Sequence, residues 1–457
     1  MKSRSLSVWL LFACAAPASA QMHLEYSGLL SPQLAGVHSK FTLAPLSPIP
    51  FPDWDNPGFV GRSYGRVDVV PVYDTGASRS GVHFGLYSNV NTAYFHRRGV
   101  VEFDRTNLNL TRIRPEAPLA FDRLHLFHEG GFGRLELGWA PGVSHRMAVT
   151  APLNWGAGSV GGDYPYFMDK PLDVGFVSVS AYGSANTAPR LVYFSPKLHG
   201  FEFGASYQPD TRYHGGDFFF GRVGSFGLLG RRSNADADLW HSGVRTPFVN
   251  PHGITNGSFE AHTAGFRHVF EAGLRSQHQW GAFRIATSVA GLVGQAVKSP
   301  TGTPFNDLRS VQAGVQVGWG GWTIGAGYVG AFDSGYGKWA HWRQRKNQWA
   351  VHGGIQYETG PWTFGIATLI GDDAGDPSER SDRQLHVYSA GLRYRISPEM
   401  DVGAEVNYIR PLSADYGDYN AIVGILQLRY RFGGSTRPGA FLPQTYGPTA
   451  LGPQQPY

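Results

Sequence analysis

The stretch AIVGILQLRYRF, from Ala421 to Phe432, decides the fold of this chain. One set of alternate positions is apolar or glycine, namely Ile422, Gly424, Leu426, Leu428, Tyr430 and Phe432. The other set includes Gln427, Arg429 and Arg431. Successive side chains of a β-strand point to opposite faces. A segment of about 10 residues with one apolar and one charged face is typical of a strand that crosses a membrane around a polar lumen.

The same design recurs upstream, each time directly after a short turn. Similar strands are expected over 132–139, 201–207, 283–295, 322–332, 362–370 and 400–409. The turns that precede them are rich in glycine, as in Gly130-Gly131 and Gly320-Gly321. Weaker strands are expected over 23–30, 65–73 and 82–90. Tryptophan or phenylalanine at the strand ends suits an aromatic girdle at the level of the lipid headgroups.

Longer and more polar segments separate these hairpins. They cover 141–175, 209–258, 297–307, 334–346, 371–382 and 411–419. Short turns on one side and long loops on the other are typical of a transmembrane barrel. We therefore predict an all-β fold, a transmembrane antiparallel β-barrel of about 16 strands. A soluble β-sandwich or propeller is the alternative, but it would not need an outward apolar face on every hairpin.

The N-terminus has the layout of a secretory signal peptide. Lys2 and Arg4 precede an apolar stretch over 6–16, and Ala18-Ser19-Ala20 offers small residues for cleavage. We predict a signal peptide over 1–20, a barrel over 21–432, and a tail over 433–457 that is rich in Pro, Gly and Gln and expected to be disordered. Cys14 is the single cysteine, so a lipoprotein is the competing interpretation of this segment.

Composition narrows the functional classes. After the signal segment no apolar run reaches the roughly 18 to 20 residues that a membrane-spanning helix needs. The net charge is +5, and without Lys2 and Arg4 it is +3, with basic residues scattered along the chain. We therefore predict no nucleic-acid partner.

Three stretches resemble the general bacterial porins: Phe132 to Gly138, Arg190 to Lys197, and Gly200 to Asp210. The resemblance implies an outer-membrane, homotrimeric diffusion channel of Gram-negative bacteria, with no enzymatic activity, cofactor or metal. It also implies that the third long loop, 141–175, folds into the barrel. The closing strand, with Tyr430 and Phe432, is similar to the terminal strand that the barrel-assembly machinery reads.

The loop and the inner wall supply the candidate site. The loop carries the acids Asp163, Asp169 and Asp173 and the aromatic residues Trp155, Tyr164 and Tyr166. Strand alternation places a basic wall inside the barrel, made of Arg66, Arg123, Arg134, Arg190, Arg275, Arg284, Arg393, Arg395, Arg429 and Arg431. On the same face it places Glu136, Glu202 and Glu405. Acids that face arginines across a pore orient polar solutes, and the excess of arginines predicts a mild preference for anions.

Other functions are considered and rank lower. A carbohydrate-selective porin could use the loop aromatics as a stacking track for sugars. An outer-membrane hydrolase would need a nucleophile, but the G-x-S-x-G match at Gly61–Gly65 precedes a strand instead of a helix. The G-x-G-x-x-G match at Gly156–Gly161 likewise has no strand before it and no helix after it. His125 and His128 are three residues apart on a strand, so they fall on opposite faces and cannot bind one metal ion.

Overall fold

The computed structural model describes the following parts of the chain: 21–41, 59–91, 100–104, 109–113, 119–161, 164, 188–210, 266–297, 306–334, 347–373, 383–412, 419–436, 448–449 and 452–453. The predicted signal peptide lies outside these residues. Within them, no helix combines the length and the apolar character that crossing a membrane requires.

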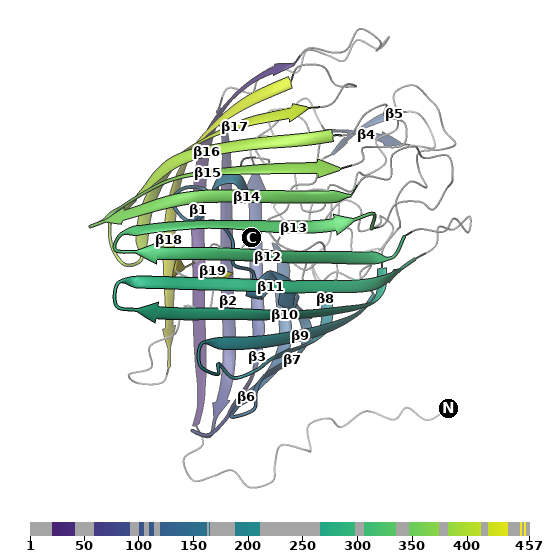
Figure 1. The fold of residues 1–457 in the computed structure, drawn as a ribbon, viewed down its shortest axis with the longest axis vertical. Coiled ribbons are helices and arrows are strands. Elements are labelled where there is room, and N and C mark those ends of the chain that lie inside the picture. The colour runs from purple at the N-terminus through teal and green to yellow at the C-terminus, as the bar shows by residue number, and fades with distance from the viewer. Residues whose placement is uncertain are drawn as a thin grey trace.

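The structure is a closed barrel of 16 strands in which every neighbouring pair is antiparallel (Figure 1). The strands are β1 (Gln21–Phe41), β2 (Phe59–Asp74), β3 (Arg79–Asn91), β6 (Leu119–Gly130), β7 (Gly133–Ala140), β8 (Ala188–Phe194), β9 (Phe201–Asp210), β10 (Phe266–Trp280), β11 (Phe283–Ala296), β12 (Leu308–Trp319), β13 (Trp322–Phe332), β14 (Gln348–Thr359), β15 (Trp362–Asp373), β16 (Arg383–Arg395), β17 (Met400–Leu412) and β18 (Tyr419–Ser435). The predicted fold and strand number are confirmed. Closure leaves no free sheet edge, so no unpaired backbone N–H or C=O group of an edge strand is exposed to the hydrocarbon core of the membrane.

Three successive hairpins share one turn geometry. Gly281, Gly320 and Gly360 have φ of 58°, 56° and 55°. Each is the first central residue of a two-residue turn, where a positive φ is characteristic of the type II′ hairpin turn and favours glycine. The turns β10–β11 and β12–β13 lie at the same end of the barrel (Figure 1). This end is the one with short connections.

The outer face is apolar, as the alternation predicts. Leu426 is 59% exposed and its neighbour Gln427 is 4% exposed. Large exposed aromatic side chains stand beside the short turns, namely Phe201, Trp280, Phe283, Trp319, Trp322 and Trp362. Exposed apolar side chains on a barrel of this kind face lipid, and tryptophan prefers the headgroup level.

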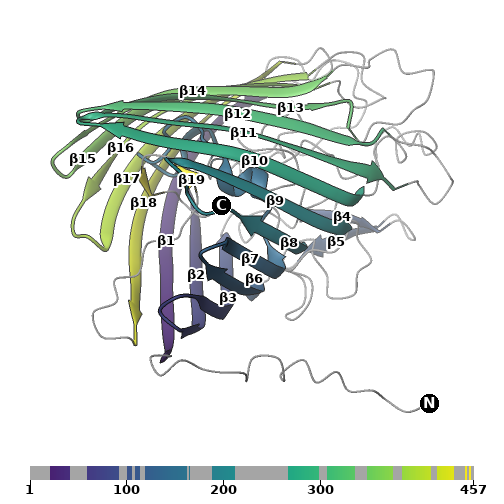
Figure 2. The ribbon, with the colours of Figure 1, turned by 60° about the horizontal axis from the view of Figure 1, so that its bottom comes forward.

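The first and last strands close the barrel side by side (Figure 2). β18 continues past Phe432 to Ser435, three residues beyond the predicted end, because Gly433 to Ser435 still pair with β1. The Phe432 ring covers Gly28 of β1 so closely that a Cβ at Gly28 would lie 2.2 Å from its Cζ. An aromatic ring over a cross-strand glycine supplies packing that the glycine lacks.

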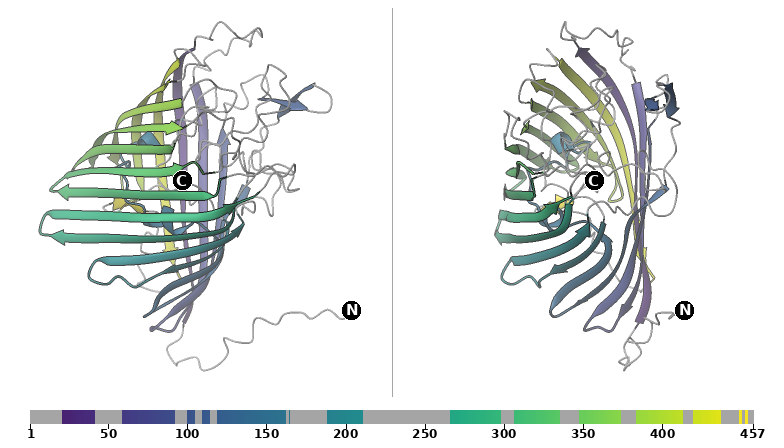
Figure 3. Two further views of the ribbon diagram at one scale, coloured as in Figure 1. Left: turned by 45° about the vertical axis from the view of Figure 1, so that its right-hand side comes forward. Right: turned by 90° about the vertical axis from the view of Figure 1, so that its right-hand side faces the viewer.

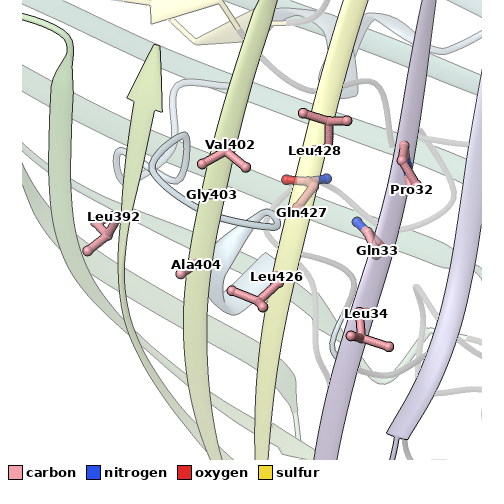
Figure 4. Close-up of a pocket in the computed structure, with 10 residues that line it drawn as sticks. All are labelled: Pro32, Gln33, Leu34, Leu392, Val402, Gly403, Ala404, Leu426, Gln427 and Leu428. Carbon is pink, nitrogen blue, oxygen red and sulfur yellow. The ribbon is translucent and has the colours of Figure 1, made fainter. Parts of the chain in front are cut away.

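This seam has one interruption. The register of β1 and β18 has partners at Leu30 and Gln33 but none at Ser31 and Pro32. Pro32 has no N–H to donate to the ladder, and the Gln427 amide instead donates to the Ser31 hydroxyl at 2.8 Å. A pocket opens on the outside of the barrel at this point, lined mainly by apolar side chains of β1, β16, β17 and β18 (Figure 4).

The interior differs from the expected polar face in one respect. Part of the inner wall is apolar, with Leu369 of β15, Leu385 and Val387 of β16, and Val423 of β18 all fully buried. Side chains of the segment 151–164 pack on this patch and form one cluster with it. The apolar patch is therefore compatible with a barrel because the loop, and not water, covers it.

Several short elements complete the described chain. The pair β4 (Val100–Asp104) and β5 (Asn109–Ile113) stands apart from the barrel sheet. Two-residue strands β19 (Pro448–Thr449) and β20 (Gly452–Pro453) pair with each other in the predicted tail, and β19 lies beside the short helix α2 (Val143–Met147). The rest of the tail after Thr436 lies outside the described residues.

Candidate functional site

The described part of the third long loop, 141–161, lies along the inner wall. Its helix α2 packs beside β9, β10 and β11 within the ring of strands (Figure 3). Val143 and Met147 of α2 join Val192 and Phe194 of β8 in a buried cluster. The Arg146 guanidinium lies over the Phe194 ring, 4.4 Å from its centroid, and pairs with Glu136 of β7 at 2.5 Å.

Polar side chains of the wall bind the loop backbone. The Ser144 N–H donates to Glu271 of β10 at 3.0 Å, and the Val149 N–H donates to the Ser288 hydroxyl of β11 at 2.8 Å. The Gln316 amide of β12 donates to the Thr150 carbonyl oxygen at 2.7 Å. Each buried backbone group of this kind needs a partner, so the loop has a defined path on the wall.

Trp155 and Tyr164, two of the predicted loop residues, are buried instead of facing the lumen. Their exposed fractions are 0% and 1%, and both belong to the apolar cluster inside the barrel. Burial, with the nearby Glu405 carboxylate, raises the pKa of the Tyr164 phenol above its ordinary value. The other predicted loop residues, Asp163, Tyr166, Asp169 and Asp173, lie outside the described residues.

The predicted arginines stand on the inner wall, but most are paired with acids. Ion pairs join Arg66 to Asp68, Arg134 to Glu129 and Glu136, Arg190 to Glu271, Arg275 to Glu202, and Arg429 and Arg431 to Asp401. Arg284, Arg393 and Arg395 form no ion pair with any residue that the structure describes. Arg395 is exposed beside the turn to β17, so it stands at the rim of the wall.

The acids Asp68, Glu271 and Asp401 were missed by the sequence prediction. Each lies on an inner face and is 4% exposed or less. Asp68 follows Arg66 by two residues, which on a strand places both on one face. The same alternation that located the arginines would therefore have found their partners, and the wall is closer to neutral than predicted.

Histidines extend this network on β3 and β6. His83 Nε2 lies 2.6 Å from Asp68 Oδ1, and the rings of His83 and His125 are 4.9 Å apart. His128 instead contacts Ser80 at 2.7 Å and stacks on Phe132 beside the turn. The prediction that His125 and His128 face opposite ways fits these contacts. In the described part of the chain no three or more His, Cys, Asp or Glu side chains come together in a way that could hold a metal ion.

Comparisons with known proteins agree with this architecture. A family model described as Gram-negative porin matches residues 7–411. An uncharacterized protein of Rickettsia typhi is 23% identical over 327 residues, which cover 64% of this chain and 70% of that protein. An uncharacterized protein of Rickettsia prowazekii is matched to the same extent.

Solved structures are also matched over nearly their whole length. The Salmonella typhi OmpF complex with daunomycin is 12% identical, covers 88% of this chain and 97% of its own, and gives a TM-score of 0.48. The anion-selective porin from Comamonas acidovorans is 13% identical, covers 90% of this chain and 100% of its own, and gives a TM-score of 0.47.

Proposed function

The chain belongs to the Gram-negative porin family, and from this premise we propose that it forms a water-filled channel for the passive diffusion of ions and small hydrophilic solutes. The family and the closed 16-stranded barrel are those of an outer-membrane protein. The family and the fold also indicate a channel and not an enzyme. The observation that carries the proposal is a membrane barrel whose inner wall keeps charged and amide side chains.

The physical basis of transport is the contrast between the two faces of the wall. The ion pair Arg275–Glu202 lies inside the barrel, is partly exposed, and can take over part of the hydration of a passing ion. The outer face is mainly apolar and contacts lipid. Diffusion of this kind needs no proton, cofactor or conformational cycle from the protein.

The proposal is tested with purified protein in a planar bilayer. We expect stepwise current increments of uniform size as single channels insert. Protein that inserts, as judged by a heat-dependent shift in gel mobility, but carries no current would contradict the proposal.

A mild preference for anions is the finer part of this proposal. It is supported by Arg284 and Arg393, which form no direct ion pair with an acid among the described residues, while most of the other wall arginines do. Under a salt gradient the reversal potential should shift modestly toward that of the anion. A shift toward the potential of the cation would overturn this preference but leave the channel itself intact.

Sugar selectivity is not favoured by the described residues. A stacking track needs exposed aromatic faces, whereas Trp155 and Tyr164 are buried. Maltose-type sugars at millimolar concentration should therefore leave the ion current unchanged.

Homotrimer assembly is proposed from membership of the family. The mass of the protein in detergent, measured by light scattering, should equal three copies of the chain. A mass of one copy would contradict it.

A further inference from the structure

Trp155 occupies a niche in the barrel wall that is made by two glycines. We call Gly365 of β15 and Gly391 of β16 the glycine cradle. A Cβ at Gly365 would lie 2.0 Å from Trp155 Cδ1, and one at Gly391 would lie 2.9 Å from Trp155 Cζ3. Neither distance can accommodate a methyl group. Any residue other than glycine at position 365 or 391 would therefore exclude the indole from this niche.

The cradle is a local feature of the inner face. Gly365 and Gly391 are direct partners in the β15–β16 ladder. The next inner positions along these strands carry side chains, Thr363 on β15 and Arg393 on β16. Glycine inside a strand weakens it and often marks a close approach of another group. Two adjacent glycines under one indole fit that interpretation.

Polar contacts on both sides complete the fit of the indole. Its Nε1–H donates to the Pro152 carbonyl oxygen at 3.2 Å, so the buried donor is satisfied inside the loop. The Ser159 N–H donates to Glu405 of β17 at 2.9 Å. Gly156 lies against the Glu405 side chain so closely that a Cβ there would be 2.2 Å from Oε2.

We propose that Trp155 is a positioning residue of the channel: seated in the glycine cradle, it holds the loop segment 151–161 on the β15–β17 wall and thereby keeps the lumen open. This rests on the proposed channel function. A loop that leaves its seat exposes Leu369, Leu385 and Val423 to water, and it places its own apolar side chains in the path of ions. The seated loop is therefore the conducting state.

Removal of the indole is the first test, with wild type and variant compared in planar bilayers. Replacing a buried tryptophan by alanine in a packed core removes a large part of its packing free energy. We therefore expect Trp155→Ala to raise the fraction of time that the channel spends in closed sublevels on the order of a hundredfold. The voltage at which channels close should fall. Trp362→Ala is the matched control, because Trp362 lies on β15 but is 40% exposed on the outer face. It should gate like wild type.

The wall offers an independent test. Gly365→Ala places a methyl group where only Trp155 atoms are the nearest neighbours, so it should reproduce the Trp155→Ala gating. Gly403→Ala is its control, because a Cβ there meets its nearest atoms at 3.5 and 3.7 Å, which is ordinary contact. In the Trp155→Ala background, Gly365→Ala should add nothing further, since both act on one contact. Additive effects would show that the cradle acts by another route.

Two results would overturn the proposal: Trp155→Ala channels that gate like wild type, or Gly365→Ala channels that gate like wild type. A wild-type protein without current would instead contradict the channel function, so the two failures are distinguishable. If Trp155→Ala does not fold, by the heat-shift assay, the Gly365→Ala and Gly403→Ala pair decides.

Discussion

At the scale of single residues, Glu271 shows how the wall and the loop depend on each other. Its carboxylate pairs with Arg190 and also accepts the Ser144 N–H of the loop. Both Glu271 and Arg190 are almost completely buried, at 4% and 2% exposure. A buried ion pair contributes little net stability, but removing one partner leaves an uncompensated charge.

Glu271→Ala should therefore destabilise the barrel by about 3–5 kcal/mol, because Arg190 would remain buried without its acid. The temperature at which the folded gel mobility is lost measures this. Asp210→Ala breaks the exposed pair with Arg267 and serves as the control, with a change expected within the scatter of the measurement. Equal losses from both variants would argue against the buried pair.

At the scale of elements, β18 shows what sequence could and could not predict. Its alternation is local, so the two faces of the strand follow from the residues 421–432 alone. Its end at Ser435 depends on pairing with Glu25 to Ser27, more than 400 residues away in sequence. An alternation pattern within one strand carries no information about which distant segment pairs with it.

The same limit explains the loop. The position of the third long loop could be predicted, but its seat could not, because Trp155 meets glycines at 365 and 391. The sequence around a tryptophan in a glycine-rich loop is compatible both with an exposed aromatic side chain and with a buried anchor. Only the three-dimensional neighbours separate the two.

Truncation tests the end of β18. A chain that stops after Thr436 should fold like the full-length protein, because among the described residues Thr436 makes the last contacts with β1, through Leu24. Phe432→Ser should lower the yield of inserted barrel, since it removes the ring over Gly28 and the stacking on Tyr430. Full insertion of the Phe432→Ser variant would contradict a role of this residue in assembly.

At the scale of the whole molecule, the charge of the lumen is a small difference between many arginines and many acids. Sequence alternation found ten arginines but overlooked Asp68, Glu271 and Asp401. The field along the pore therefore depends on the few guanidinium groups that lack an acid. Arg284 is one of these, with its guanidinium 3.1 Å from the Cβ position of Gly318 on β12.

Arg284→Glu should shift the reversal potential toward the cation by several millivolts under a tenfold salt gradient, because the variant reverses one uncompensated charge inside the barrel. Arg309→Glu makes the same change at an exposed position on the outer side of β12. It should leave the reversal potential unchanged. Equal shifts would mean that total protein charge, and not the lumen, sets selectivity.

The repeated turns at Gly281, Gly320 and Gly360 have a consequence for how such a barrel can change its size. Because the backbone leaves one strand and enters the next in the same way at each turn, the piece between two turns is an interchangeable building block of one loop and two strands. Gain or loss of such a block changes the circumference by a whole hairpin and returns both chain ends to the same side of the membrane. Duplication or excision of gene segments bounded by these glycines would thus give wider or narrower barrels that need no new type of turn.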